Sequence, residues 1–336
     1  MNPCITVVMP AYNAQATIET ALKSIRMQTV ADQIEILVID GGSTDATREI
    51  ALRYGAAVLD NPRRLPEPAK QIGVQNARGK YVVFQDSDEE LLSPDQLENR
   101  IRFFEEFPYV KCLVIDRQYP GKDGGSVASY YCACGDPFTW FIYQFKERAL
   151  ITFSQNCEKK GTFGCVLQFS PGALTPIGDG GTAMIDLDWV KKEFPKEWDK
   201  IHFACSVVHR VIQKTGYCGC IPDDDIVHHV QTGFMSYLSK LRFRVTNNLF
   251  HKQESGFSAR TQNEGAAYIS RRKYLFVLYA ATLIGPLVDS VRLAWHYRDP
   301  RMLFHIFYLY YVCFYVAYCV IAKFFGKKFS VTSYGK

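Results

Sequence analysis

Several features that would assign a protein to a class at once are absent from this sequence of 336 residues. The net charge is only +5, with 39 basic and 34 acidic residues, which is too balanced to indicate binding to nucleic acid. The 11 cysteines are odd in number and irregularly spaced, so they do not suggest a secreted disulfide framework. Residues 1–10 have no basic segment and only a short apolar run, unlike a signal peptide. We therefore expect the N-terminal part of the chain to be cytoplasmic.

Long apolar runs are also missing until the C-terminal part, and this divides the chain. Hydrophobic residues make up 48% and charged residues 22% of the whole, which excludes an intrinsically disordered protein. The composition changes at about residue 231, where basic residues begin to share helical spacing with apolar ones. We expect a globular domain over 1–230, a basic amphipathic juxtamembrane segment over 231–270 and membrane-associated helices over 271–336.

The first hundred residues alternate between short apolar runs and segments of helical periodicity. The runs expected to be strands are 4–9, 34–39, 56–59 and 81–85, and the segments expected to be helices are 15–28, 46–54 and 69–77. Alternation at this spacing predicts an α/β fold with a doubly wound, mostly parallel sheet. The pattern is less regular from 110 to 230, so we expect that part to complete a mixed sheet.

Polar residues follow three of the predicted strands directly. They form the loops Pro10–Asn13, Asp40–Asp45 and Asp86–Asp88. Because ligands of such sheets bind at the carboxyl ends of the strands, we expect these loops to share one site. Asp86 and Asp88 offer two carboxylates one residue apart, which suits Mg²⁺ or Mn²⁺. Such a cation would stabilise a diphosphate as a leaving group.

Two apolar segments, 274–288 and 302–322, follow the basic amphipathic segment. Only the second is long enough to cross a bilayer as a straight helix. Positive charge lies at all three ends of this pair, in Arg271–Lys273, in Arg298 and Arg301, and in Lys323, Lys327 and Lys328. Since basic residues favour the cytoplasmic side, we expect helices that lie in, or dip into, the cytoplasmic leaflet. A spanning hairpin and a buried pair of helices are the alternatives.

Four motifs in the first half resemble those of family 2 nucleotide-sugar glycosyltransferases, which have the GT-A fold. They are Thr6–Asn13 (TVVMPAYN), Ile39–Asp45 (IDGGSTD), Lys70–Ala77 (KQIGVQNA) and Tyr81–Glu89 (YVVFQDSDE), in the order and spacing of the family. The resemblance covers about residues 4–95 and thins out towards 230. It implies an inverting, metal-dependent enzyme that moves a sugar from a nucleoside diphosphate, UDP or GDP, to an acceptor.

The resemblance also implies which residues bind the donor and the metal. The donor-binding residues would be Pro10, Ala11, Tyr12, Asn13, Asp40, Ser43, Lys70, Asp86 and Ser87. Asp86, Asp88 and His228 would bind the metal, here Mg²⁺ or Mn²⁺.

Each of these roles competes with a simpler structural one. Asn13 and Ser43 could instead cap the helices that follow them. Lys70 could be an exposed lysine on the surface of a helix. His228 could be a histidine of the core, in which case His229 would have the functional role. The run Asp223–Asp225 is expected to be a solvated turn.

The sequence departs from the family where the catalytic base is usually found. Counting back from Gly216, the usual acidic pair at the start of a late helix falls on Ala204 and Cys205. The nearest groups that could accept a proton are Asp199 and His202, one turn earlier. The other possibilities are Asp179, Asp186, Asp188 or no protein base.

The amphipathic segment and the apolar tail predict an acceptor at the membrane. We expect a lipid-linked acceptor, such as a polyprenyl-linked glycan in surface glycan assembly. One alternative is a polyprenyl phosphate, whose ionised phosphate is itself the nucleophile and needs no base. An alternative of another class is a non-catalytic scaffold that binds nucleotide and membrane.

Overall fold

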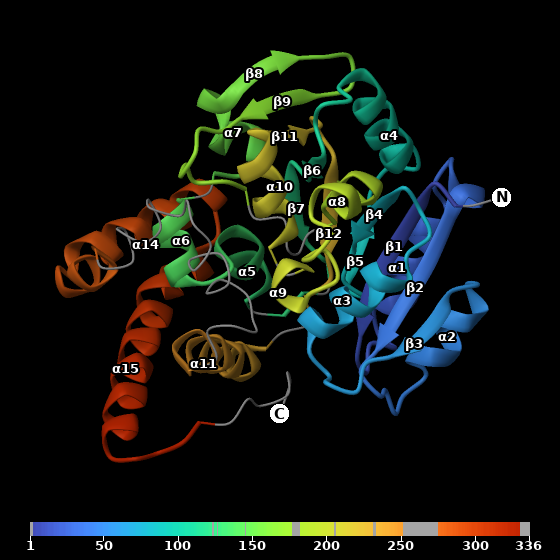
Figure 1. Cartoon of the computed structure of the whole chain (residues 1–336). Helices are drawn as coiled ribbons and strands as arrows, with labels where there is room; N and C mark the ends of the chain where they lie inside the picture. Colours follow the sequence, from blue (N-terminus) through green and yellow to red (C-terminus); the bar gives the residue numbers. More distant parts are fainter. Residues whose placement is uncertain are drawn as a thin grey trace.

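The computed structural model describes residues 3–122, 124–125, 127–144, 146–176, 182–204, 206–230, 233–250 and 275–329. In this part of the chain a nine-stranded mixed sheet has the order β3-β2-β1-β4-β10-β6-β11-β9-β8. Figure 1 shows this sheet with helices on both faces and the C-terminal helices gathered on one side of the molecule.

The predicted strands of the first hundred residues are present and parallel. They are β1 (Ile5–Ala11), β2 (Ile34–Asp40), β3 (Ala57–Asp60) and β4 (Tyr81–Phe84). β1 lies between β2 and β4, and Ala11 is opposite Asp40 in the register. The ends of β1 and β2, and the loops that follow them, therefore meet at one edge of the sheet.

Helices cover the two faces of the sheet in two separate apolar layers. One layer contains α1 (Ile18–Arg26), α2 (Thr47–Arg53) and α4 (Gln96–Glu106), and the other contains α3 (Pro66–Asn76), α8 (Leu187–Glu193) and α10 (Val207–Thr215). A Cβ atom at Gly73 would lie 2.2 Å from Val8 Cγ1, so glycine lets α3 pack tightly on β1. This close approach brings α3 to the edge where the loops meet.

The second half completes the sheet with strands of both directions. β10 (Met184–Asp186) runs antiparallel to β4 and to β6 (Cys112–Val114), and β11 (Tyr217–Cys220) is parallel to β6. The antiparallel pair β8 (Cys157–Lys160) and β9 (Cys165–Gln168) forms the far edge. The short helices of this half are α7 (Ala149–Thr152), η2 (Ser154–Asn156) and α9 (Ile201–Ala204), and the short helix η1 (Ala31–Gln33) precedes β2 in the first half.

A second, three-stranded sheet positions the end of this domain beside the loops. Its order is β5-β12-β7, with β5 (Glu89–Leu91), β12 (Asp225–His228) and β7 (Arg117–Pro120). β12 is antiparallel to β5, and His228 is opposite Glu89. This pairing carries His228 to the loop that follows β4.

The expectation of a solvated turn at Asp223–Asp225 is wrong for two of the three residues. Asp224 is buried and accepts hydrogen bonds from the Arg100 guanidinium, whose Nε lies 2.8 Å from Asp224 Oδ2. Asp225 is also buried, and only Asp223 is largely exposed. Arg100 is itself fully buried, so the pair joins α4 to the strand that carries His228.

The C-terminal helices pack on the domain and form a third apolar cluster. Figure 1 shows α11 (Phe234–Phe250), α14 (Ile284–Tyr297) and α15 (Phe304–Phe324) beside α5 (Ala128–Cys134) and α6 (Pro137–Tyr143). The short helix η3 (Pro300–Leu303) leads into α15. Tyr237 of α11, Tyr130 of α5 and Tyr308 of α15 are buried against one another. The predicted amphipathic helix is present as α11, and its apolar face covers α5 and α15.

One helix in the described ranges, Pro300–Phe324, is long and apolar enough to cross a membrane. The shorter apolar segment is two helices, Leu275–Ala281 and Ile284–Tyr297, which meet at an angle of 86°. These properties come from length and composition alone. The packing of the helices therefore has to decide how they lie relative to a membrane.

Candidate functional site

The loops after β1 and β2 are hydrogen-bonded to each other. The Asn13 backbone N–H donates to Ser43 Oγ at 2.8 Å, and the Thr44 N–H donates to Asn13 Oδ1 at 2.9 Å. The caps of α1 and α2 are Thr17 and Ala46, so neither Asn13 nor Ser43 caps a helix. The two loops therefore form one rim, with Pro10 and Ala11 at the end of the strand below it.

Tyr12 and Asp40 occupy opposite environments in this rim. Tyr12 is exposed and lies against Gly41, where a Cβ atom would come within 3.3 Å of its side chain. Asp40 is fully buried and accepts hydrogen bonds from the backbone N–H groups of Gly42 and Ser43. Its Oδ2 is also 2.8 Å from Arg48 Nη1. In these contacts Asp40 holds its own loop in shape.

The segment Asp86–Glu89, which we name the acidic loop, follows β4. Asp86, Ser87 and Asp88 are partly exposed, whereas Glu89 is buried and its Oε2 accepts from the Asp86 N–H at 3.0 Å. Burial and the neighbouring Asp86 carboxylate raise the pKa of Glu89 to about 8. The acidic loop therefore concentrates carboxyl groups that repel one another when ionised.

Lys70 of α3 supplies positive charge to the acidic loop. Its side chain is buried, and its ammonium nitrogen lies 5.8 Å from the centre of the Phe84 ring. Burial raises the pKa of Asp86, and the Lys70 ammonium opposes that rise. Lys70 is therefore not the exposed helix charge that was the alternative interpretation.

The side chain of His228, and not that of His229, contacts the Asp88 carboxylate of the acidic loop. His228 Nε2 lies 3.1 Å from Asp88 Oδ2, and Gln118 of β7 contacts the other ring nitrogen. Burial lowers the pKa of His228, but the carboxylates of the acidic loop outweigh burial and raise it to about 9. His229 pairs instead with Glu90, at 2.7 Å.

A lysine that sequence reasoning did not place in the site also lies near the acidic loop. Lys240 of α11 is partly buried, and its ammonium nitrogen is 5.5 Å from the centre of the Tyr131 ring. The Tyr131 ring in turn meets the His228 ring edge-on, with 5.4 Å between centres. The helical pattern around residue 240 predicted a basic face, but which basic residue meets the acidic loop depends on the packing of α11 against α5.

The two candidate bases lie beside α3, in α9 and in the residues just before it. The Asp199 carbonyl accepts from Gln71 Nε2 at 2.8 Å, and its carboxylate is 3.4 Å from Lys200 Nζ. His202 lies in α9, and its side chain is outside the described part of the structure. Of the expected acidic pair, Ala204 is buried and Cys205 is outside the described residues, as is Asp179.

The side chains that could serve as metal ligands suit a hard cation only in part. Within the described ranges, no three histidine, cysteine or carboxylate side chains are already arranged around one point as metal ligands. Asp86 and Asp88 nevertheless offer partly exposed carboxylate oxygens, which are the ligands that Mg²⁺ and Mn²⁺ prefer. The residues present therefore fit a divalent cation that takes its remaining ligands from a bound diphosphate or water.

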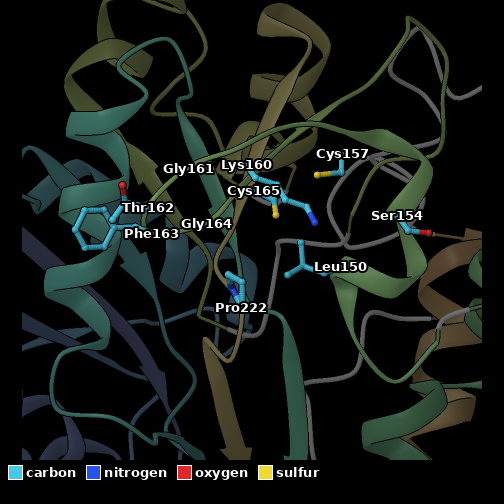
Figure 2. Close-up of a pocket in the computed structure, with 10 residues that line it drawn as sticks. All are labelled: Leu150, Ser154, Cys157, Lys160, Gly161, Thr162, Phe163, Gly164, Cys165 and Pro222. Atoms are coloured by element: carbon cyan, nitrogen blue, oxygen red, sulfur yellow. The ribbon is translucent and has the colours of Figure 1, made fainter.

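A separate pocket of about 360 Å³ lies at the far edge of the sheet (Figure 2). It is lined by Leu150, Ser154, Cys157, Lys160, Gly161, Thr162, Phe163, Gly164, Cys165 and Pro222. It contains none of the predicted donor- or metal-binding residues.

Known proteins are similar to the first half of this chain. Residues 6–166 match the family Glycosyl transferase family 2. EpsH of Bacillus subtilis is 35% identical over 108 residues, which are 30% of this chain and 30% of EpsH. The GalNAc(5)-diNAcBac-PP-undecaprenol beta-1,3-glucosyltransferase of Campylobacter jejuni is 35% identical over 98 residues, 27% of this chain and 31% of that protein. The chain thus aligns with less than a third of the length of these two relatives.

A solved structure supports the fold over almost the whole chain. The mannosyltransferase PcManGT from Pyrobaculum calidifontis is 17% identical, with a TM-score of 0.54, and the match covers 95% of this chain and 88% of that one. The predicted GT-A class, with its mixed and mostly parallel sheet, is confirmed. Residues 6–166 of this chain are thus similar to the family 2 glycosyltransferases.

Proposed function

We propose that this protein transfers a sugar from UDP or GDP to a lipid-linked acceptor at the cytoplasmic leaflet of a membrane, with inversion. The observation that carries this proposal is the convergence of the acidic loop, Lys70 and His228 at the edge where the rim of Asn13 and Ser43 lies. A nucleoside diphosphate needs both kinds of surface, because its base and its phosphates differ in chemistry. The base requires polar groups such as those of the rim, and the phosphates require charged groups such as those at the acidic loop.

On the donor side, the rim holds the nucleoside and the acidic loop holds the diphosphate. Asp86 and Asp88 bind Mg²⁺ or Mn²⁺, which neutralises the diphosphate and makes it a better leaving group. Lys70 adds a positive charge beside Asp86. The structure of PcManGT, which shares the fold, was solved in complex with GDP-Man and Mn²⁺, and this is consistent with such a donor and cation here.

The surface of the tail supports association with a membrane. Large apolar side chains of the C-terminal helices are between 61% and 86% exposed: Val277, Leu278, Leu283, Ile284, Trp295, Phe314, Phe324 and Phe325. An exposed apolar surface of this extent is unusual for a monomeric soluble protein. Lys323, Lys327 and Lys328 follow at its end and would attract anionic lipids.

The packing of α15 favours a helix that lies in the leaflet over one that spans it. Tyr308 and Val312 of α15 are buried in the third apolar cluster, together with residues of α5 and α11. A helix that spans a bilayer is in contact with lipid. In contrast, α15 packs against α11, which carries the charged residues Arg242 and Arg244. The exposed side of α15 can enter the leaflet while its buried side stays on the catalytic domain.

A lipid-linked acceptor follows from this position at the membrane. The Campylobacter jejuni relative is named for an undecaprenol-linked acceptor, which supports the same class here, although the aligned part covers 31% of that protein. A hydroxyl acceptor needs a base, for which Asp199 and His202 are our candidates. A polyprenyl phosphate is the alternative acceptor and needs none.

A donor screen tests the proposal. Full-length protein, Mn²⁺ and a membrane lipid extract are incubated with UDP- and GDP-sugars in turn, and the extract is analysed by mass spectrometry. We expect one donor to give a lipid product heavier by one sugar, and EDTA to abolish it. Nucleotide binding without transfer from any donor would support the scaffold alternative.

The two forms of acceptor are separated by variants of the candidate bases. With the identified acceptor at saturation, Asp199→Asn and His202→Gln are compared with the unaltered protein. A fall in kcat of about a hundredfold or more at either position, with donor binding retained, assigns a base and a hydroxyl acceptor. Nearly unchanged rates in both variants assign the phosphate acceptor.

A further inference from the structure

Helix α11 lies outside the family-matched residues, yet it borders the acidic loop. The matched part ends at residue 166, whereas α11 spans Phe234–Phe250. Tyr237 is buried, and its hydroxyl donates to the Gly135 carbonyl at 3.0 Å. This contact fixes α11 on the end of α5.

Tyr131 of α5 connects α11 with the acidic loop. Lys240 and Arg244 lie one turn apart on α11, and each places its charged group 5.5 Å from the centre of the Tyr131 ring. Arg244 also donates to the Tyr131 hydroxyl at 3.1 Å and pairs with Asp136 at 2.9 Å. The edge of the same ring meets His228, which contacts Asp88.

The two cations of α11 therefore have different surroundings. Arg244 is held by Asp136 and the Tyr131 hydroxyl, so it acts as a structural clamp. Burial lowers the pKa of Lys240, and the carboxylates of Asp88 and Asp86 oppose that effect, so the ammonium group lies within electrostatic reach of both. Lys240 is thus a second lysine, besides Lys70, that adds positive charge to the acidic loop.

We propose that Lys240 binds a phosphate group seated at the acidic loop. The inference rests on the proposed function, because it assigns a further binding residue to the same site. A diphosphate at Asp86 and Asp88 carries more negative charge than one divalent cation neutralises, and an ammonium group can accept the remainder through charge-assisted hydrogen bonds. The phosphate belongs either to the nucleotide or to the lipid acceptor, since both must meet at this point.

The position of Lys240 also depends on the tail. Tyr237 packs edge-on against Tyr308 of α15, with 4.9 Å between ring centres, and Thr246 lies within 3.4 Å of the Tyr315 hydroxyl. The exposed side of α15 is the surface that we assign to the membrane. The helix that carries Lys240 is therefore held between the acidic loop and the membrane-facing helix.

The test compares Lys240→Ala and Lys240→Arg with Arg242→Ala in the full chain in detergent. Arg242 lies on the same helix, is exposed and contacts Ser239, so its variant removes an equal charge away from the site. Calorimetry measures the affinity for UDP, GDP and the corresponding nucleosides with Mn²⁺. Flotation measures binding to phosphatidylcholine vesicles with and without undecaprenyl phosphate.

For a nucleotide phosphate, we expect Lys240→Ala to weaken diphosphate binding about tenfold and leave nucleoside binding unchanged. For a lipid phosphate, the same variant should instead lose the binding that depends on undecaprenyl phosphate. Lys240→Arg should retain most of the affinity, and Arg242→Ala should match the unaltered protein. Either pattern supports the inference and identifies the source of the phosphate.

Unchanged binding of every probe by Lys240→Ala would overturn the inference and leave the proposed function intact. An equal loss in Arg242→Ala, or an equal loss of nucleoside binding, would also overturn it, because the effect would then not be specific to phosphate at Lys240. If the unaltered protein bound neither UDP nor GDP, the proposed function and this inference would fail together.

Discussion

His228 Nε2 lies 3.1 Å from Asp88 Oδ2, although the two residues are far apart in the sequence. The contact exists because β12 pairs with β5, the strand that begins inside the acidic loop. The small sheet thus joins the late part of the domain to the early motif. A histidine at this point can orient Asp88 for the metal and diphosphate binding that we propose.

The adjacent histidines offer a matched comparison. His228→Asn should lower kcat/KM for sugar transfer about a hundredfold, because it removes the group that contacts Asp88. His229→Asn should change it only a few-fold, since His229 pairs with Glu90. Steady-state kinetics with the identified donor measures both. Equal losses in the two variants would contradict the assignment of His228.

The buried pair of Arg100 and Asp224 should matter for stability. Asp224→Asn should lower the free energy of unfolding by about 3–5 kcal/mol, because it leaves the Arg100 guanidinium buried without its counter-charge. Asp223→Asn is the control, since the Asp223 side chain is 75% exposed. Urea unfolding of the three proteins in the same detergent measures the difference. A cost of under about 1 kcal/mol for Asp224→Asn would show that the pair is not important for stability.

Membrane binding should depend on the exposed side of the C-terminal helices. The double variant Trp295→Glu and Phe314→Glu should lose most co-sedimentation with anionic vesicles, because each side chain contributes about 2 kcal/mol when it enters the lipid. Leu52→Glu changes an apolar residue that is 61% exposed on α2 and should bind normally. Normal binding by the double variant would show that another surface meets the membrane.

His209 of α10 should make stability depend on pH. Burial and the neighbouring Arg210 lower its pKa to about 4 from a usual value of 6.5. Between these values the unfolded chain binds the proton more readily than the folded protein does, so the free energy of unfolding falls as the pH falls. This group should account for about 2 kcal/mol of the difference between neutral pH and about pH 5.

The variant His209→Gln removes this group, and urea unfolding at the two pH values measures the effect. His209→Gln should lose less stability on acidification than the unaltered protein does. The exposed residue His296 provides the control for the substitution itself, as His296→Gln. A slope that His209→Gln does not alter would contradict the low pKa of His209.

Local patterns in the sequence predicted the first half of the fold and the meeting of the loops after β1 and β2. β1, β2 and β4 are continuous apolar runs, and a parallel sheet brings the loops at their carboxyl ends together whatever the rest of the chain does. The hydrogen bond from Asn13 to Ser43 is a consequence of that order. The motif residues therefore lie where their spacing predicts.

Contacts between distant segments could not be predicted in the same way. In the sequence Asp224 resembles a turn residue, and its role becomes visible only when α4 places Arg100 beside it. Lys240 is one of several basic residues in the sequence, and only its contact with Tyr131 distinguishes it from the others. Both depend on pairing and packing between elements that are far apart in the chain. A sequence pattern indicates whether a segment forms a helix or a strand, but not which other segment it packs against.

The most direct test of the account compares Asp88→Ala with Glu90→Ala. Both carboxylates pair with a histidine, at 3.1 Å and 2.7 Å, but only Asp88 is assigned to the metal and diphosphate. The measurement is the rate of transfer of a radiolabelled sugar from its nucleotide into the lipid fraction, with Mn²⁺ present. The account predicts that Asp88→Ala lowers this rate about a thousandfold or more, and that Glu90→Ala keeps it within a few-fold of the unaltered protein. Undiminished transfer by Asp88→Ala would contradict the account.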